Sequence, residues 1–227
     1  MDDRPLATLV IAEHDNQSLA VGTRCAIKAA FDIKDDAKSL PISVLLIGYQ
    51  CQSVLDELKC VKGVAEIIWV DAKEYEHGLA ENIAPLISQV AKNYSHILSP
   101  ASTFGKNVMP RVAALLDVGQ LSDVMTIESI DTVIRPIYAG NALATVTSND
   151  PFKVMTIRST AFDALEMGVG GTFDVVAGKV KRAPQWMQKA GLEWLYRVIQ
   201  EPGRMWKRYL ITNSKFAYLL IKNKFGS

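Results

Sequence analysis

The sequence has few cysteines and histidines, which form disulfides and bind metals, and it has no long apolar run that could cross a membrane. Its three cysteines, Cys25, Cys51 and Cys60, are an odd number without CxxC spacing, and they predict free thiols in a reducing compartment. The three histidines stand apart without metal-ligand spacing, so we predict no metal site. No apolar run approaches the roughly 18 residues that cross a bilayer, and the first residues are acidic where a secretion signal is basic. We therefore expect a cytoplasmic protein whose membrane contact is peripheral at most.

The charge is distributed unevenly along the chain. The 227 residues are 49% hydrophobic and 22% charged, which is typical of a globular protein, and the formal net charge is +1. Residues 165–227 carry eleven Lys and Arg against four Asp and Glu, a net of +7, whereas residues 1–164 carry a net of −6. Such asymmetry predicts two parts with different partners, one of them anionic. We therefore divide the chain into a first part, residues 1–164, and a second part, residues 165–227.

Short apolar runs alternate with helical patterns over the first 120 residues. The runs lack polar alternation, which is typical of strands buried on both faces, and strand–helix alternation indicates a parallel sheet between two layers of helices. We therefore predict a doubly wound α/β fold with a mostly parallel sheet. The expected strands are residues 6–12, 42–48, 66–70 and 95–98, and the expected helices are residues 18–31, 53–61, 79–91 and 107–116.

The pattern changes after Asp117 to short β-rich runs separated by Asp, Gly, Asn and Pro. These runs predict the strands of a meander or a sheet edge, at residues 123–129, 133–138, 143–147 and 153–158. Residues 139–141, Ala-Gly-Asn, are typical of a hairpin turn, and Pro136 confines its strand to an edge or to its first residues.

Two segments of the first part are candidate sites. Lys106 and Asn107 are expected at a helix start after a strand, with Arg111 one turn on, where a helix N-terminus favours anions. The segment is either a phosphate site or an ordinary strand-to-helix loop capped by Ser and Thr. Residues 135–146 form either a contact surface or a plain hairpin.

Residues 6–164 resemble a known family in four ordered segments, TLVIAEHDNQSL, ASTFGKNVMPRVAALLDVGQLSDV, RPIYAGNALATV and RSTAFDA. Together they resemble the N-terminal domain of the electron transfer flavoprotein alpha subunit. In that family a second domain follows and holds most of the FAD, and a beta subunit completes the heterodimer. The resemblance implies a scaffold that docks a beta subunit, while FAD is not expected to be held by this chain alone. The docking candidates are Lys106, Asn107, Arg111, Arg135, Tyr138 and Asn141.

The second part resembles a different family, the C-terminal end of the bacterial WecG/TagA/CpsF glycosyltransferases. The segments GVGGTFD, GKVKRAP, GLEWLYR and EPGRMWKR arrive in family order over residues 165–225. Those enzymes transfer an N-acetylmannosamine-type sugar from a UDP donor to an undecaprenyl-diphosphate-linked acceptor at the inner membrane face. The catalytic half of that family precedes GVGG and is missing here, so no catalytic residue is assigned.

The residues of the second part suggest contact with an anion. Arg197, Arg204 and Arg208 are spaced by seven and four, so on a continuous helix they share a face, with Lys207 adjacent. Guanidinium groups suit a diphosphate, and basic residues among Trp and Leu suit a helix in a membrane interface over residues 186–225. The alternative is a solvated basic face over a packed apolar one, and Pro202 interrupts the helix. We expect no nucleic-acid partner.

Three glycines at the start of the second part, Gly168, Gly170 and Gly171, either cradle a donor diphosphate or form a tight turn. Our hypothesis is that the chain joins two truncated proteins near Ala164 and Leu165. The main prediction is an electron-carrier component that lacks a flavin domain and is impaired or non-catalytic alone. The alternative is a membrane-peripheral, glycosyltransferase-like protein.

Overall fold

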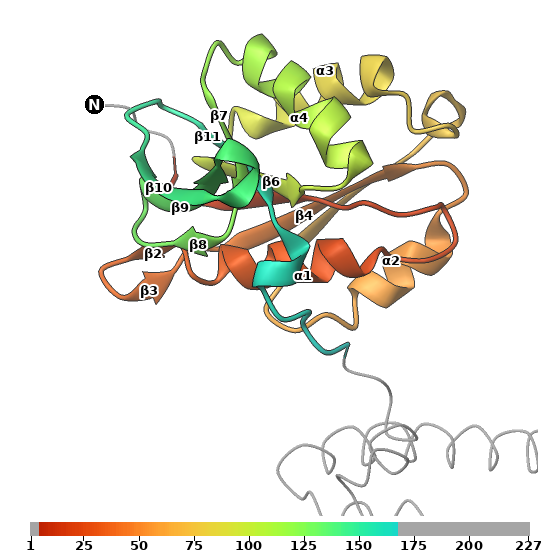
Figure 1. The fold of residues 1–227 in the computed structure, drawn as a ribbon. Helices are drawn as coiled ribbons and strands as arrows, with labels where there is room; N and C mark the ends of the chain where they lie inside the picture. The colour runs from red at the N-terminus through yellow and green to blue at the C-terminus, as the bar shows by residue number, and fades with distance from the viewer. Residues whose placement is uncertain (1–4, 168–227) are drawn as a thin grey trace, which may run out of the picture. The chain divides into compact units, whose positions relative to one another are not determined.

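The computed structural model describes residues 5–167, and all of the basic second part beyond residue 167 lies outside these residues. A six-stranded sheet forms the centre, in the order β5-β4-β1-β6-β11-β7, and every neighbouring pair is parallel. Helices α1 and α2 cover one face and α3 and α4 the other (Figure 1). The predicted doubly wound α/β fold is confirmed for this part of the chain.

The elements have the following bounds. The strands of the main sheet are β1 (Thr8–Ile11), β4 (Ile42–Gly48), β5 (Glu66–Asp71), β6 (His96–Pro100), β7 (Gln120–Val124) and β11 (Lys153–Ile157). The helices are α1 (Val21–Ala30), α2 (Gln52–Leu58), α3 (Ala80–Ala91) and α4 (Thr103–Leu115). The remaining elements are β2 (Lys34–Asp35), β3 (Lys38–Ser39), β8 (Thr126–Ile127), β9 (Thr132–Ile137) and β10 (Ala142–Thr147), and the short 3-10 turns η1 (Lys73–Tyr75), η2 (Tyr138–Gly140) and η3 (Ser159–Ala161).

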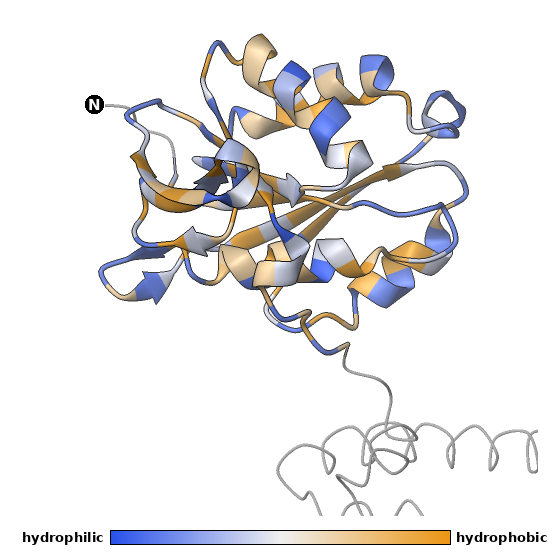
Figure 2. Cartoon of the chain, viewed as in Figure 1, coloured by the Kyte–Doolittle hydropathy of each residue, from blue (hydrophilic) through white to orange (hydrophobic). Residues whose placement is uncertain are grey.

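Each face of the main sheet has its own hydrophobic core, because successive side chains of a strand point to opposite faces. In β1, Leu9 and Ile11 pack in the cluster that contains α3 and α4, whereas Val10 packs in the cluster that contains α1 and α2. The central strands are accordingly coloured mostly hydrophobic (Figure 2). Burying one such side chain contributes about 1.5–3 kcal/mol.

The chain between β7 and β11 forms a second, three-stranded antiparallel sheet, in the order β10-β9-β8. The turn predicted at residues 139–141 is found at the tip of the β9–β10 hairpin. The expectation that Pro136 lies on an edge strand or among the first residues of its strand is wrong, because β9 is the middle strand and Pro136 is its fifth residue. Pro136 lies beyond the part of β9 that pairs with β8, where a missing N–H breaks no bond to that strand.

Two further expectations about local structure are wrong. Helix α4 begins at Thr103 and not at residue 107, because Ser102 is the N-cap and its Oγ accepts a hydrogen bond from the Gly105 N–H at 3.2 Å. Lys106 therefore lies one turn inside the helix. The strand expected at 153–158 as part of a meander or sheet edge is β11, which lies inside the main sheet between β6 and β7. Its apolar side chains face both cores, with Val154 on one face and Met155 and Ile157 on the other.

The chain leaves the sheet along the α1 and α2 layer. After β11, Phe162, Leu165 and Met167 pack against the core cluster of that layer. The Arg24 guanidinium donates a hydrogen bond to the Leu165 carbonyl at 3.1 Å, and Met167 pairs with Val61. No helix within residues 5–167 is long and apolar enough to span a membrane.

Candidate functional site

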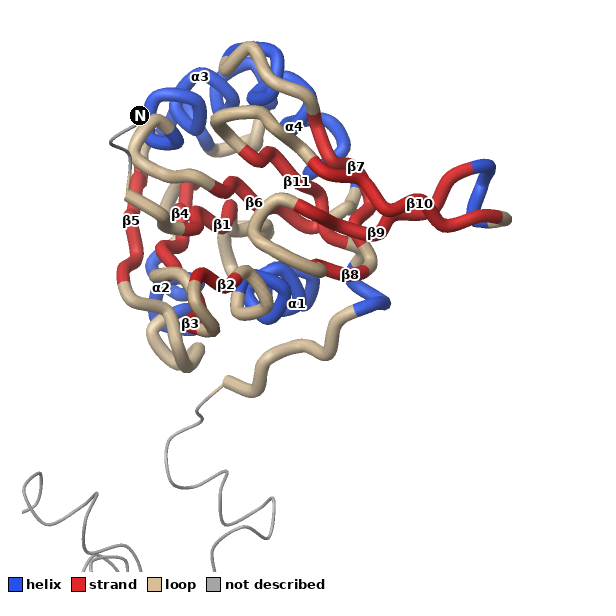
Figure 3. Tube along the Cα trace, turned by 90° about the vertical axis from the view of Figure 1, so that its left-hand side faces the viewer, coloured by secondary structure: helices blue, strands red, loops and turns tan. Residues whose placement is uncertain are grey.

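The β9–β10 hairpin, residues 132–147, projects from the body of the domain (Figure 3). At its tip Tyr138 and Ala139 have φ angles of 50° and 55°, in the left-handed region that costs a non-glycine residue about 1–2 kcal/mol. Tyr138 is 79% exposed and Leu143 is 62% exposed. Strained backbone that presents exposed apolar side chains is typical of a binding surface.

The outer edge of the hairpin is open. Among the described residues β10 pairs with β9 alone, and its sequence, ALATVT, has neither charge nor proline. Natural edge strands are usually protected by a charge, a proline or a covering element, because their free N–H and C=O groups pair readily with another strand. The open edge and the exposed Leu143 therefore form one surface suited to a strand of a partner.

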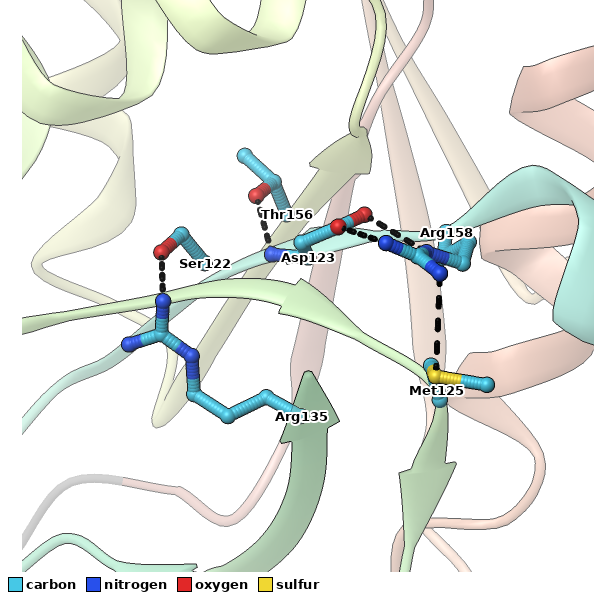
Figure 4. Close-up of polar contacts among 6 residues, drawn as sticks. All are labelled: Ser122, Asp123, Met125, Arg135, Thr156 and Arg158. Atoms are coloured by element: carbon cyan, nitrogen blue, oxygen red, sulfur yellow. Dashed lines mark hydrogen bonds and ion pairs between the residues drawn. The ribbon is translucent and has the colours of Figure 1, made fainter. Parts of the chain in front are cut away.

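An ion pair lies at the base of the hairpin, where β7 and β11 end (Figure 4). The Arg158 guanidinium donates to both carboxylate oxygens of Asp123, and Arg158 Nη1 lies 3.9 Å from Met125 Sδ. The Asp123 N–H donates to Thr156 Oγ1 at 2.9 Å, and Asp123 has a φ of 61°. The hydrogen bond from Arg158 lowers the pKa of Asp123, and the charges of Arg158, Lys106 and Arg135 add to this effect while partial burial opposes it.

A second arginine ties the hairpin to the main sheet. Arg135 on β9 donates from Nη2 to Ser122 Oγ on β7 at 2.6 Å (Figure 4). Its Nε is buried and has no hydrogen-bond partner in the described part of the chain. Arg135 thus ties the hairpin to β7, and Arg158 ties the end of β11 to the same strand.

The candidates on α4 do not form one site with the hairpin tip. Arg111 makes an ion pair at 2.8 Å with Glu81 on α3, and both side chains are largely exposed. Lys106 and Asn107 are exposed, and Ser102 caps the helix as in an ordinary strand-to-helix loop. On the hairpin, Tyr138 and Asn141 lie exposed at the tip.

The remaining candidates lie outside the described residues: Gly168, Gly170, Gly171, Arg197, Arg204, Lys207 and Arg208. Sequence reasoning missed Arg158 and gave Asp123 no partner. The available signal was that Asp123 begins one predicted β-rich run and Arg158 ends another, but their contact follows only once β7 and β11 are neighbours.

Comparison with known proteins gives two families for different parts of the chain. A sequence model of the electron transfer flavoprotein domain matches residues 8–183, and one of the glycosyl transferase WecG/TagA/CpsF family matches residues 154–227. The two matches overlap over residues 154–183.

Curated relatives match the first part of the chain. The electron transfer flavoprotein subunit alpha of Pseudomonas aeruginosa is 49% identical over 160 residues, covering 70% of this chain and 50% of the relative. The mitochondrial protein of that name from Dictyostelium discoideum is 46% identical over 176 residues, covering 74% and 48%, and that of Paracoccus denitrificans is 44% identical over 170 residues, covering 75% and 53%. The chain thus spans about half the length of these relatives.

Proposed function

Because the chain belongs to the electron transfer flavoprotein domain family, we propose that it is an alpha-subunit-like component of an electron carrier and docks a beta subunit through the β9–β10 hairpin. The observation that carries this proposal is the open edge of β10 beside the exposed Tyr138 and Leu143. A partner strand on this edge gains main-chain hydrogen bonds, and tyrosine is among the residues that most often dominate binding energy at interfaces.

The family is one of flavoproteins, but residues 5–167 do not fit FAD. They contain a cavity of about 290 Å³ at the carboxyl ends of β1 and β4, at the low end of the roughly 300–1,000 Å³ typical of pockets for small ligands. The Asp15 and Glu76 carboxylates line it without a Lys or Arg from the described residues, so a pyrophosphate is repelled there. We therefore propose that this domain is a scaffold and that the chain alone is non-catalytic.

The test measures binding of the full chain to a purified electron transfer flavoprotein beta subunit by calorimetry. Tyr138→Ala and Leu143→Lys are expected to weaken binding about tenfold or more, as at interface hot spots. Leu79→Lys is the matched control, because Leu79 is also exposed, at 51%, but lies before α3. Equal affinity of Leu143→Lys and Leu79→Lys contradicts docking at the hairpin. A stoichiometric flavin spectrum of the purified chain contradicts the proposal that it holds no FAD alone.

A second candidate function rests on the match of residues 154–227 to the glycosyltransferase family. We propose that this segment contacts an anionic surface or a lipid-linked diphosphate at the inner face of the membrane, as a UDP-sugar-dependent transferase of that type requires. Arg197, Arg204 and Arg208 would supply the contacts. The full chain with these three arginines changed to glutamine is expected to co-sediment less with anionic liposomes than the unchanged chain. Equal sedimentation of the two proteins contradicts the proposal.

A further inference from the structure

The cavity at the carboxyl ends of β1 and β4 lies where the strand order of the main sheet reverses. After β1 the chain proceeds to β4 on one side, and after β5 it crosses back to β6 on the other side of β1. In doubly wound sheets, ligands bind in the crevice at this point. Residues from the loop after β1, the end of β4, the loop before α3 and the start of α4 line the cavity, whose volume is about 290 Å³.

Asn16 holds the loops of this cavity in place. Its Nδ2 donates to the Glu76 carbonyl at 3.0 Å, and its Oδ1 accepts from the Tyr49 N–H at 3.2 Å. Its φ of 68° lies in the left-handed region. A Cβ on Gly48 would lie 2.5 Å from Asn16 Oδ1, so the loops fit closely around the side chain. The cavity is therefore preformed, and a ligand does not have to order its walls.

One wall is a neutral histidine. His14 Nε2 donates to the Ile47 carbonyl at 2.9 Å, and its Nδ1 accepts from the Asn16 N–H at 3.0 Å. Each ring nitrogen is used, and the acceptor at Nδ1 requires the neutral tautomer. Burial lowers the pKa of His14, which maintains that form.

The rim of the cavity is acidic. The lining includes the exposed residues Asp15 and Glu76 together with His77, and no Lys or Arg within residues 5–167 lines the cavity. The backbone N–H groups of Ser18 and Gln17 hold the pKa of Asp15 below its usual value, so its carboxylate is ionised at neutral pH. This rim attracts a cation and repels phosphate or carboxylate.

Apolar and aromatic residues also line the cavity, namely Ile47, Ile83, Phe104 and Tyr75. Aliphatic side chains suit the body of an organic ligand, and aromatic faces attract an ammonium group. We propose that the cavity binds a small organic amine with an apolar or aromatic body, whose ammonium group lies near Asp15 and Glu76. The site is separate from the hairpin and does not depend on its function.

The test titrates the full chain with two probes of the same size and opposite charge, phenethylamine and 3-phenylpropanoate, followed by amide chemical-shift mapping. The amine is expected to shift amides of the cavity lining, and the carboxylate is expected not to bind there. Asp15→Asn keeps the oxygen that accepts from the Gln17 and Ser18 N–H groups, and Glu76→Gln keeps the carbonyl that accepts from Asn16. Each is expected to raise the dissociation constant of the amine about two- to fivefold, as for an exposed ion pair.

Glu74→Gln is the matched control, since Glu74 is exposed, lies two residues from Glu76 and does not line the cavity. It is expected to leave the dissociation constant unchanged. The proposal is overturned if phenethylamine shifts no amide of the lining at saturating concentration or if both probes bind equally. It is also overturned if Glu76→Gln and Glu74→Gln have the same effect.

Discussion

Acidification is expected to destabilise this domain through a buried histidine on its central sheet. His96 begins β6 and is 1% exposed. Its Nε2 donates to the Ile130 carbonyl at 2.6 Å, and its Nδ1 lies 2.8 Å from Ser95 Oγ. Burial lowers the pKa of His96 below the ordinary value of 6.5, and the charge of Lys153 adds to this effect while the bond to Ile130 opposes it.

The sign of the effect follows from where the proton binds. Below pH 6.5 the unfolded chain binds a proton on this histidine before the folded chain does, so the free energy of unfolding falls as the pH falls. The contribution is complete above pH 6.5 and is lost between that pH and the lower pKa of the folded state. The slope for one histidine is at most about 1.4 kcal/mol per pH unit. His14, whose pKa is also lowered by burial, adds a second contribution in the same direction.

Hydrogen exchange of the β1 and β6 amides in the full chain, corrected for intrinsic exchange, measures this free energy between pH 7.5 and pH 5. His96→Gln is expected to lower the free energy of unfolding at pH 7.5, because glutamine fills the site of the imidazole imperfectly. It is also expected to reduce the dependence of that free energy on pH below pH 6.5. The double change with His14→Gln is expected to reduce the slope further. An unchanged slope in the double variant refutes the reasoning, because the acid sensitivity then comes from other groups.

Three further predictions concern packing and thiol chemistry. Gly105→Ala is expected to destabilise the domain by about 1–3 kcal/mol, measured by hydrogen exchange, because the new Cβ would lie 1.9 Å from a backbone carbonyl oxygen at the end of β6. A variant as stable as the unchanged protein would contradict this contact. Leu98→Ala, at a fully buried position of β6, is expected to cost about 2–5 kcal/mol by the same measurement, and a cost below about 1 kcal/mol would contradict the packing described. When the native chain is labelled with a thiol reagent, Cys60 is expected to react first, because it is exposed while Cys25 and Cys51 are buried and burial raises their pKa values. Faster labelling of either buried thiol would contradict this order.

The main sheet could be predicted from the sequence because its information is local. Strands β1 and β4, within the apolar runs at residues 6–12 and 42–48, are buried on both faces, and each is followed by a shorter helix that overlaps the predicted one. The position of β11 could not be predicted, because the three strands of the antiparallel sheet lie in the sequence between β11 and its two neighbours, β6 and β7. A strand's composition reports its burial and not which strands it pairs with.

The candidate site divides in the same way. The hairpin turn at residues 139–141 could be predicted because its glycine and asparagine are adjacent in sequence. The pair of Asp123 and Arg158 spans 35 residues and depends on the register of β7 with β11. His14 has no role assigned from sequence, because its partner Ile47 comes from another strand.

The place of β11 between β6 and β7 also constrains how the protein is made. A nascent chain emerges from its N-terminus, so β1, β4, β5 and β6 can pair first, in the order of synthesis. Strand β7 is made before β11 but has no parallel neighbour until residues 153–157 have emerged. Until then the edge of β6 that pairs with β11 has free N–H and C=O groups that can pair with other chains, which is a known route to aggregation. We therefore expect ribosome-bound chains that stop before residue 153 to recruit chaperones, and chains extended well beyond residue 157 to release them.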